Sequence, residues 1–157
     1  MAYKVGYPVA SQGLLTDVDT VQRNPLGQVA FDEAGAEYIY LQGIGSTVVG
    51  SVVTYGLTAT NAHLTALSVT GARGPVAIAM AITVASNYGW YLRRGAGTAI
   101  YNGAAVAAAL LFSAGTGKCD DAVVAGDRIE GAFVGATVTG SGAGSVFVNY
   151  PFMNGNG

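Results

Sequence analysis

The sequence predicts an all-β fold: a compact β-barrel or β-sandwich of short antiparallel strands with an extended N-terminal arm. Short segments rich in aromatic and β-branched residues recur at intervals of roughly 8–12 residues, a spacing typical of such folds. Most of the 24 glycines lie between these segments, where turns need them. The glycines follow no fixed period, so the pattern does not indicate a repeat protein.

The N-terminal segment, residues 1–24, shows no clear period and predicts an extended arm before a β-domain at residues 25–157. A disordered terminus is the alternative. The segment has more apolar side chains than a solvated tail needs, which favours an ordered arm. Its candidate interface residues are Tyr3, Val5, Tyr7, Leu14 and Leu15.

The first part of the domain predicts three strands separated by turn residues. These strands cover residues 26–31, 37–41 and 48–55. Gly50, inside the third strand, indicates a bulge or a close backbone approach. Residues 58–68 contain enough Ala and Leu for a short helix, whereas their neighbours favour a strand or a loop.

The middle of the chain contains a strict alternation of large and small residues over Pro75 to Ala85. This period of two predicts a strand with one bulky face and one small face. A further strand is expected at residues 90–93. The pair Asn102-Gly103 lies between two apolar segments, which predicts a hairpin.

The last part of the chain begins with a polar segment, residues 115–122, which predicts a loop. Apolar residues then alternate through residues 128–139, and a Gly-rich turn follows at residues 140–144. A final strand is expected from Ser145 to Tyr150, ended by the proline that follows.

The composition indicates that much of the surface is covered by other protein chains. Hydrophobic residues make up 51% of the chain and charged residues 10%, against about 25% charged residues in a typical soluble domain. The longest apolar stretch, residues 75–85, is shorter than the roughly 20 residues that a membrane-spanning helix needs. The N-terminus has no continuous apolar core, so no signal peptide is expected.

The charge pattern argues against a nucleic-acid partner. The net charge is −2 and the basic residues are scattered along the chain, whereas nucleic-acid binding requires a basic patch. A single cysteine excludes an intrachain disulfide, which fits synthesis in a reducing cytoplasm.

The chemistry-bearing residues do not predict an enzyme. His63 is the single histidine, and its neighbours offer no partner for a general base. Cys119 precedes two aspartates, whose charge disfavours the thiolate of a nucleophile. Residues 115–118 lack the spacing of a phosphate-binding loop. No catalytic residue, cofactor or metal site is therefore predicted.

Aromatic residues cluster at Tyr88, Trp90 and Tyr91, which are also candidate interface residues. In a strand, Tyr88 and Trp90 face one side and Tyr91 the other. Such residues serve in a core, at a subunit interface or as a platform for a glycan.

The order of short motifs resembles the small capsid decoration, or cement, proteins of tailed bacteriophages. The resemblance covers residues 25–152 and rests on the overall pattern rather than on one diagnostic motif. Its motifs are residues 25–27, 35–40, 73–79, 88–90 with Gly95, 120–127 and 148–151.

The resemblance implies a structural virion protein on the capsid exterior, synthesised in the host bacterial cytoplasm. Its expected partners are the major capsid protein and copies of itself, often as a homotrimer. It would clamp neighbouring capsomers without catalysis. The alternatives are a head-fibre or receptor-binding module that recognises host glycans, or another minor head or tail structural protein.

Overall fold

The computed structural model describes residues 14–56, 63–125 and 127–155, and its regular structure is entirely β. The all-β prediction is confirmed. Within the described ranges, no helix is long and apolar enough to span a lipid bilayer. The strands are β1 (Val29–Phe31), β2 (Glu37–Gln42), β3 (Val52–Tyr55), β4 (Thr65–Leu67), β5 (Arg73–Ala79), β6 (Tyr88–Tyr101), β7 (Leu110–Gly115), β8 (Lys118–Asp120), β9 (Arg128–Val134) and β10 (Gly142–Asn154).

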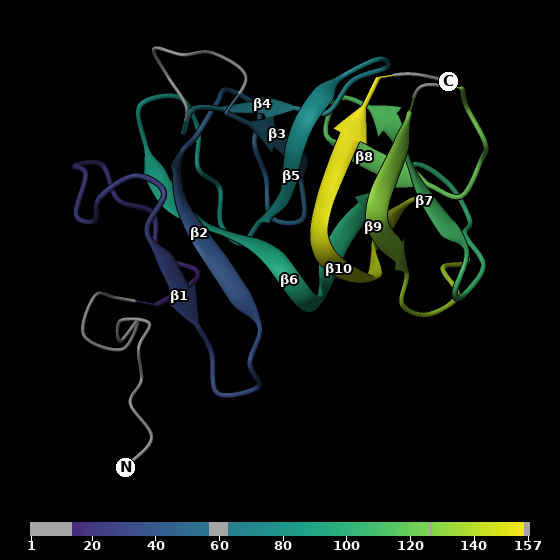
Figure 1. The fold of residues 1–157 in the computed structure, drawn as a ribbon, viewed down its shortest axis with the longest axis horizontal. Coiled ribbons are helices and arrows are strands. Elements are labelled where there is room, and N and C mark those ends of the chain that lie inside the picture. The colour runs from purple at the N-terminus through teal and green to yellow at the C-terminus, as the bar shows by residue number, and fades with distance from the viewer. Residues whose placement is uncertain (1–13, 57–62, 126, 156–157) are drawn as a thin grey trace.

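The ten strands form one mixed sheet in the order β1-β2-β6-β8-β7-β9-β10-β5-β3-β4. Because β10 pairs with β6 as well as with β9, the strands β6, β8, β7, β9 and β10 close into a ring. The first half of β6 pairs with β2 and β5, and its second half pairs with β10 and β8. The long strand β6 therefore joins the two halves of the molecule, one with β1 to β5 and the other with β7 to β10 (Figure 1).

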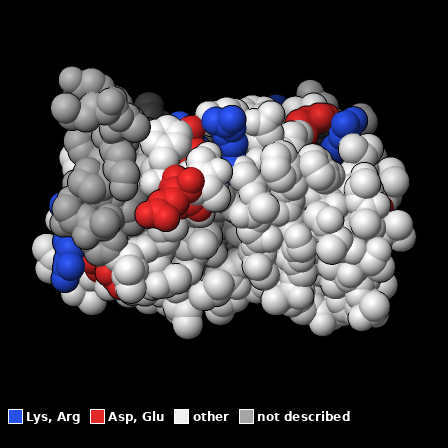
Figure 2. Space-filling model, turned by 90° about the horizontal axis from the view of Figure 1, so that it is seen from below, with Lys and Arg blue, Asp and Glu red and all other residues white. Residues whose placement is uncertain are grey.

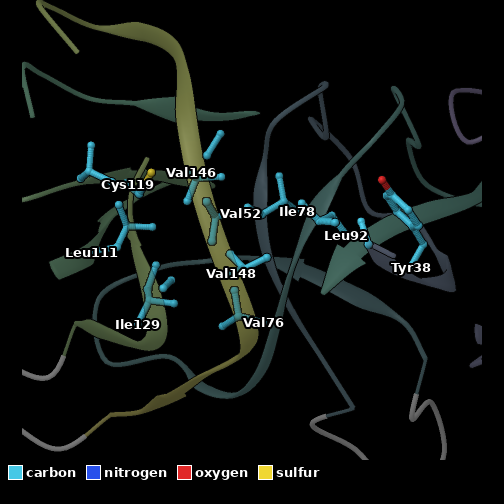
Figure 3. Close-up of a cluster of buried hydrophobic side chains, with 14 of the residues drawn as sticks. Tyr38, Val52, Val76, Ile78, Leu92, Leu111, Cys119, Ile129, Val146 and Val148 are labelled. Atoms are coloured by element: carbon cyan, nitrogen blue, oxygen red, sulfur yellow. The ribbon is translucent and has the colours of Figure 1, made fainter. Parts of the chain in front are cut away.

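The sheet is covered on both faces by buried side chains. Successive residues of β6 enter different clusters: Trp90 belongs to the larger cluster and Tyr91 to the smaller one. Figure 3 shows part of the larger cluster, with side chains from both halves of the molecule. In β5 the alternation has the same result, because Val76 and Ile78 lie in the larger cluster and Ala77 in the smaller one.

The predicted strand at residues 75–85 is too long at its C-terminal end. β5 ends at Ala79, and Ile82 and Val84 are exposed. The chain turns away at this point, where the Thr83 amide donates to the Ala81 carbonyl at 3.0 Å. The alternation continues in the sequence, but it has no neighbouring strand to pair with.

The hairpin predicted at Asn102-Gly103 is wrong. The Asn102 amide donates to the Cys119 carbonyl at 2.8 Å. The end of β6 therefore pairs with β8, and the chain does not turn back on β6 at this point. The hairpin lies instead at Thr116 and Gly117, whose φ angles of 52° and 76° suit the tight turn between β7 and β8. The second half of β6 already pairs with β10 and β8, which leaves no edge for a hairpin with β7.

Strand β10 does not end at Tyr150 as predicted. It continues through Pro151 to Asn154, because its register against β9 shifts between Val148 and Phe152. A bulge of this kind tolerates a proline, which has no amide to donate to the ladder. Tyr150 lies in the bulge with a φ of 49°.

Two further predictions were partly correct. β1 and β3 are shorter than the segments predicted for them, because residues 26–28 and 48–51 lie in turns and irregular backbone. In the ambiguous segment 58–68 the structure has the short strand β4, and residues 57–62 lie outside the described residues.

Candidate functional site: an uncharged apolar face

The single cysteine is buried. Cys119 is 0% exposed, and its thiol donates to the Ile100 carbonyl at 3.5 Å. Burial, with a smaller contribution from the charge of Asp120, raises the pKa of the thiol to about 12. His63 is half-buried, and the described residues contain no group of three or more His, Cys, Asp or Glu that could hold a metal ion.

Cys119 is therefore expected to resist thiol reagents in the folded protein. With its raised pKa, the thiolate fraction near neutral pH falls roughly a thousandfold below that of a free cysteine. An aromatic disulfide reagent should therefore label the native protein roughly a thousandfold more slowly than the same protein in denaturant. Labelling at equal rates in the two conditions would contradict the burial.

A charged cluster joins β2, β6 and the bulge in β10. The Glu37 side chain is 4% exposed, and the Arg93 guanidinium forms an ion pair with it. The Tyr150 hydroxyl donates to the second Glu37 oxygen at 2.7 Å, and the Arg93 guanidinium lies 5.4 Å from the centre of the Tyr150 ring. These contacts satisfy the buried carboxylate and tie the two halves of the sheet together.

A second cluster fixes the segment before β1. Asp19 is buried and pairs with Tyr88 through two backbone hydrogen bonds of 2.9 and 2.8 Å. Its carboxylate accepts a hydrogen bond of 2.6 Å from the Tyr40 hydroxyl and forms an ion pair of 3.1 Å with Arg23. In both clusters the buried carboxylate is bound by side chains of the same chain, which indicates a structural role.

The buried tyrosines are expected to make the fold less stable at alkaline pH. Burial is the main cause that raises the pKa values of Tyr38, Tyr40 and Tyr101. Above about pH 10 the unfolded chain releases these protons first, so stability should decrease as the pH rises further. Each tyrosine contributes at most on the order of 1 kcal/mol per pH unit, since water that reaches the hydroxyl reduces the shift.

The decrease in stability at alkaline pH is measured as the urea midpoint of unfolding at several pH values between about 9 and 11.5. Tyr40→Phe removes one titrating group and should make the decrease shallower. A midpoint that does not change over this range would refute the prediction.

The structure distributes the predicted interface residues over different environments. Trp90 and Tyr91 are 2% and 0% exposed, so neither ring is open for a sugar to stack on. Tyr88 is half-buried and stacks on Tyr40, with ring centres 6.3 Å apart. Leu15 packs against the core and Leu14 is exposed. Tyr3, Val5 and Tyr7 lie outside the described residues.

A surface without charged side chains lies on the half of the molecule that β7 to β10 form. Residues 95–117 and 131–157 contain no Asp, Glu, Lys or Arg. The fold brings these two segments together, because β10 pairs with β6 and β9 pairs with β7. Figure 2 shows a broad area without charged side chains on the half built from β7 to β10, with charged side chains along its upper edge.

A row of exposed apolar side chains crosses four strands of this half. The register places Leu110 of β7 beside Phe133 of β9, Phe133 beside Phe147 of β10, and Phe147 beside Ala96 of β6. The two phenylalanine rings stack with centres 4.9 Å apart. Leu110, Phe133 and Phe147 are 48%, 40% and 38% exposed. We call the row of Leu110, Phe133, Phe147 and Ala96 the uncharged apolar face.

Sequence reasoning missed this face. The signal that could have found it is the absence of charge over two long segments, combined with the alternation around Phe133 and Phe147. That signal becomes a surface only when the pairing of β6 with β10 and of β7 with β9 is known.

Comparison with known proteins adds a likeness of fold. No family model matches the chain, and no curated protein matches its sequence. The structure is similar to that solved for the head fiber gp8.5 N base in bacteriophage phi29, with a TM-score of 0.55 and 5% sequence identity. The match covers 74% of this chain and 97% of the other. At this identity, what the two chains are shown to share is a fold.

Proposed function

We propose that this chain is a structural protein of a bacteriophage head. The observation that carries the proposal is the fold likeness to the base of a phage head fibre, which covers nearly the whole of that solved chain. The low charge of the sequence adds support. Subunits of a phage head bury part of their surface against one another, and charged residues are depleted at the centres of such interfaces.

The more specific proposal is a decoration protein. In this role the chain binds the outer surface of the capsid, contacts the major capsid protein and clamps neighbouring capsomers. The sequence resemblance to decoration proteins supports this role. The fold likeness gives comparable support to a second role, in which the chain is the base of a head fibre.

One experiment tests the proposal and separates the two roles. Heads of the phage that encodes the chain are prepared without it, incubated with the purified protein and sedimented. Bound copies are counted against the major capsid protein, and the temperature at which packaged DNA is released is measured with and without the added chain.

Both structural roles predict co-sedimentation. A decoration protein should saturate many equivalent sites and raise the temperature of DNA release. A fibre base should bind without changing that temperature. Absence of the chain from the sedimented heads at saturating concentration would overturn the proposal.

A further inference from the structure

We propose that Asn102 is a site of spontaneous deamidation in the folded protein, promoted by the hydroxyl of Ser141. This inference concerns a covalent modification of the chain and does not depend on a role in a phage head. The sequence has three Asn-Gly pairs, at residues 102–103, 154–155 and 156–157. The structure describes both members of the first two pairs, and it places them in different surroundings.

The reaction is an attack by the main-chain nitrogen of Gly103 on the side-chain carbonyl carbon of Asn102. A bond forms between this nitrogen and Cγ, the bond from Cγ to Nδ2 breaks, and ammonia leaves with the proton of the Gly103 N–H. Water then opens the cyclic succinimide at either of its two carbonyls, which leaves aspartate or isoaspartate. A glycine favours ring closure because it has no Cβ to hinder the attacking nitrogen.

The groups that react at Asn102 are accessible. Asn102 is exposed and lies in a bend just after the end of β6. Among the described residues, neither the Asn102 side chain nor the Gly103 N–H forms a hydrogen bond. A Cβ placed on Gly103 would meet nothing within 4 Å. The nitrogen and the side-chain amide can therefore approach each other without first losing a hydrogen bond of their own.

The hydroxyl of Ser141 stabilises the charge that develops in this reaction. It donates a hydrogen bond of 2.5 Å to the main-chain carbonyl of Asn102, which belongs to the same peptide group as the Gly103 nitrogen. When that nitrogen loses its proton, negative charge spreads onto the carbonyl oxygen, and a donor already aimed at the oxygen lowers the barrier. The sheet holds this donor in place, because Gly142 of β10 pairs with Tyr101 of β6 at the adjacent position.

The second pair, Asn154-Gly155, provides an internal comparison. Asn154 is the last residue of β10 and pairs with Arg73 of β5. A Cβ placed on Gly155 would lie 2.6 Å from Cγ of Arg73 and 2.8 Å from the Gly71 carbonyl oxygen, so this glycine is crowded. The end of the strand must open before Asn154 can adopt the conformation that ring closure requires, and a local opening of this kind slows the reaction by about tenfold or more.

Deamidation at Asn102 changes the charge of a region that has none. Either product places a negative charge in segment 95–117, which contains no Asp, Glu, Lys or Arg. The net charge of the chain, −2 before the reaction, becomes more negative by one unit. An aged preparation is therefore a mixture of two charge forms, which ion-exchange chromatography separates.

The test follows the asparagines by peptide mass spectrometry while the folded protein is incubated at mildly alkaline pH. Trypsin cleaves after Arg94 and Lys118, so Asn102 is the single asparagine of its peptide. Fragmentation of the C-terminal peptide distinguishes Asn154 from Asn156. A sample digested at the start of the incubation corrects for conversion during digestion.

In the native wild type, Asn102 should convert at least about tenfold faster than Asn154. In denaturant the two rates should become similar, because both pairs are then free of the fold. Equal rates in the native protein would overturn the proposal. So would an Asn102 that stays intact in the native protein over a time in which it converts in denaturant.

Three variants test the role of the hydroxyl. Ser141→Ala should slow the conversion of Asn102 about two- to tenfold, as expected for the loss of one hydrogen bond, and leave Asn154 unchanged. Ser141→Thr keeps a hydroxyl and should retain the wild-type rate. Gly103→Ala, whose Cβ fits into open space, should slow Asn102 by hindering the nitrogen.

Circular dichroism and thermal melting establish that each variant is folded. Conversion of Asn102 in the Ser141→Ala variant at or above the wild-type rate would show that the hydroxyl does not promote the reaction, which refutes that part of the proposal. The comparison of native with denatured wild type needs no variant, so it tests the site even if a substitution disturbs the fold.

Discussion

Arg93→Ala is expected to destabilise the fold by about 3–5 kcal/mol, because it leaves the buried carboxylate of Glu37 without its cation. The Tyr150 hydroxyl would remain as the partner of that carboxylate at 2.7 Å, and a neutral donor compensates only part of the cost of burying a charge. For a chain of this size the melting temperature should decrease by roughly 10 °C or more. Urea unfolding followed by circular dichroism measures the change.

Two comparisons make this prediction specific. Arg94→Ala changes the adjacent and exposed arginine and should alter stability by less than about 0.5 kcal/mol. Glu37→Gln in the Arg93→Ala background removes the orphaned charge and should restore part of the loss, so the cycle of four proteins isolates the pair energy. Equal effects of Arg93→Ala and Arg94→Ala would show that the ion pair contributes nothing to stability.

Trp90→Ala is expected to cost about 3–5 kcal/mol, because it leaves a large cavity in the centre of the sheet. The indole is 2% exposed and packs edge-on against Tyr40, with ring centres 5.2 Å apart. Trp90 lies on β6, which joins the two halves, so the cavity should weaken both of them. The unfolding midpoint in urea, again followed by circular dichroism, measures the loss.

The control substitutions separate packing from surface effects. Trp90→Phe keeps a ring in the core and should cost clearly less than the alanine variant. Val123→Ala changes an apolar residue that is 83% exposed and should be nearly neutral. If Trp90→Ala were as stable as the wild type but changed the native mass, Trp90 would act at a subunit interface rather than in the core.

The two halves of the molecule differ in the distribution of their charged side chains. Near β1 and β2, the carboxylate of Asp19 is paired with Tyr40 and Arg23, and that of Glu37 with Arg93 of β6 and Tyr150 of β10. The half with β7 to β10 presents the broad area without charged side chains that Figure 2 shows.

The sequence by itself determined the fold class, because aromatic and β-branched segments between glycine turns have few alternatives to strands. It also indicated the strong strand at residues 37–41, which became β2, since a local pattern was enough there. It located the bulky and small faces of β5, because side chains alternate wherever a strand forms.

The tertiary structure alone decided which strands pair and therefore which apolar residues remain outside. Asn102-Gly103 looks like a hairpin turn, but β10 and β8 already occupy the second half of β6. Trp90 and Phe133 are both apolar residues in strands, yet one is 2% and the other 40% exposed. The difference arises from contacts between segments far apart in the chain, and no local pattern of residues contains that information.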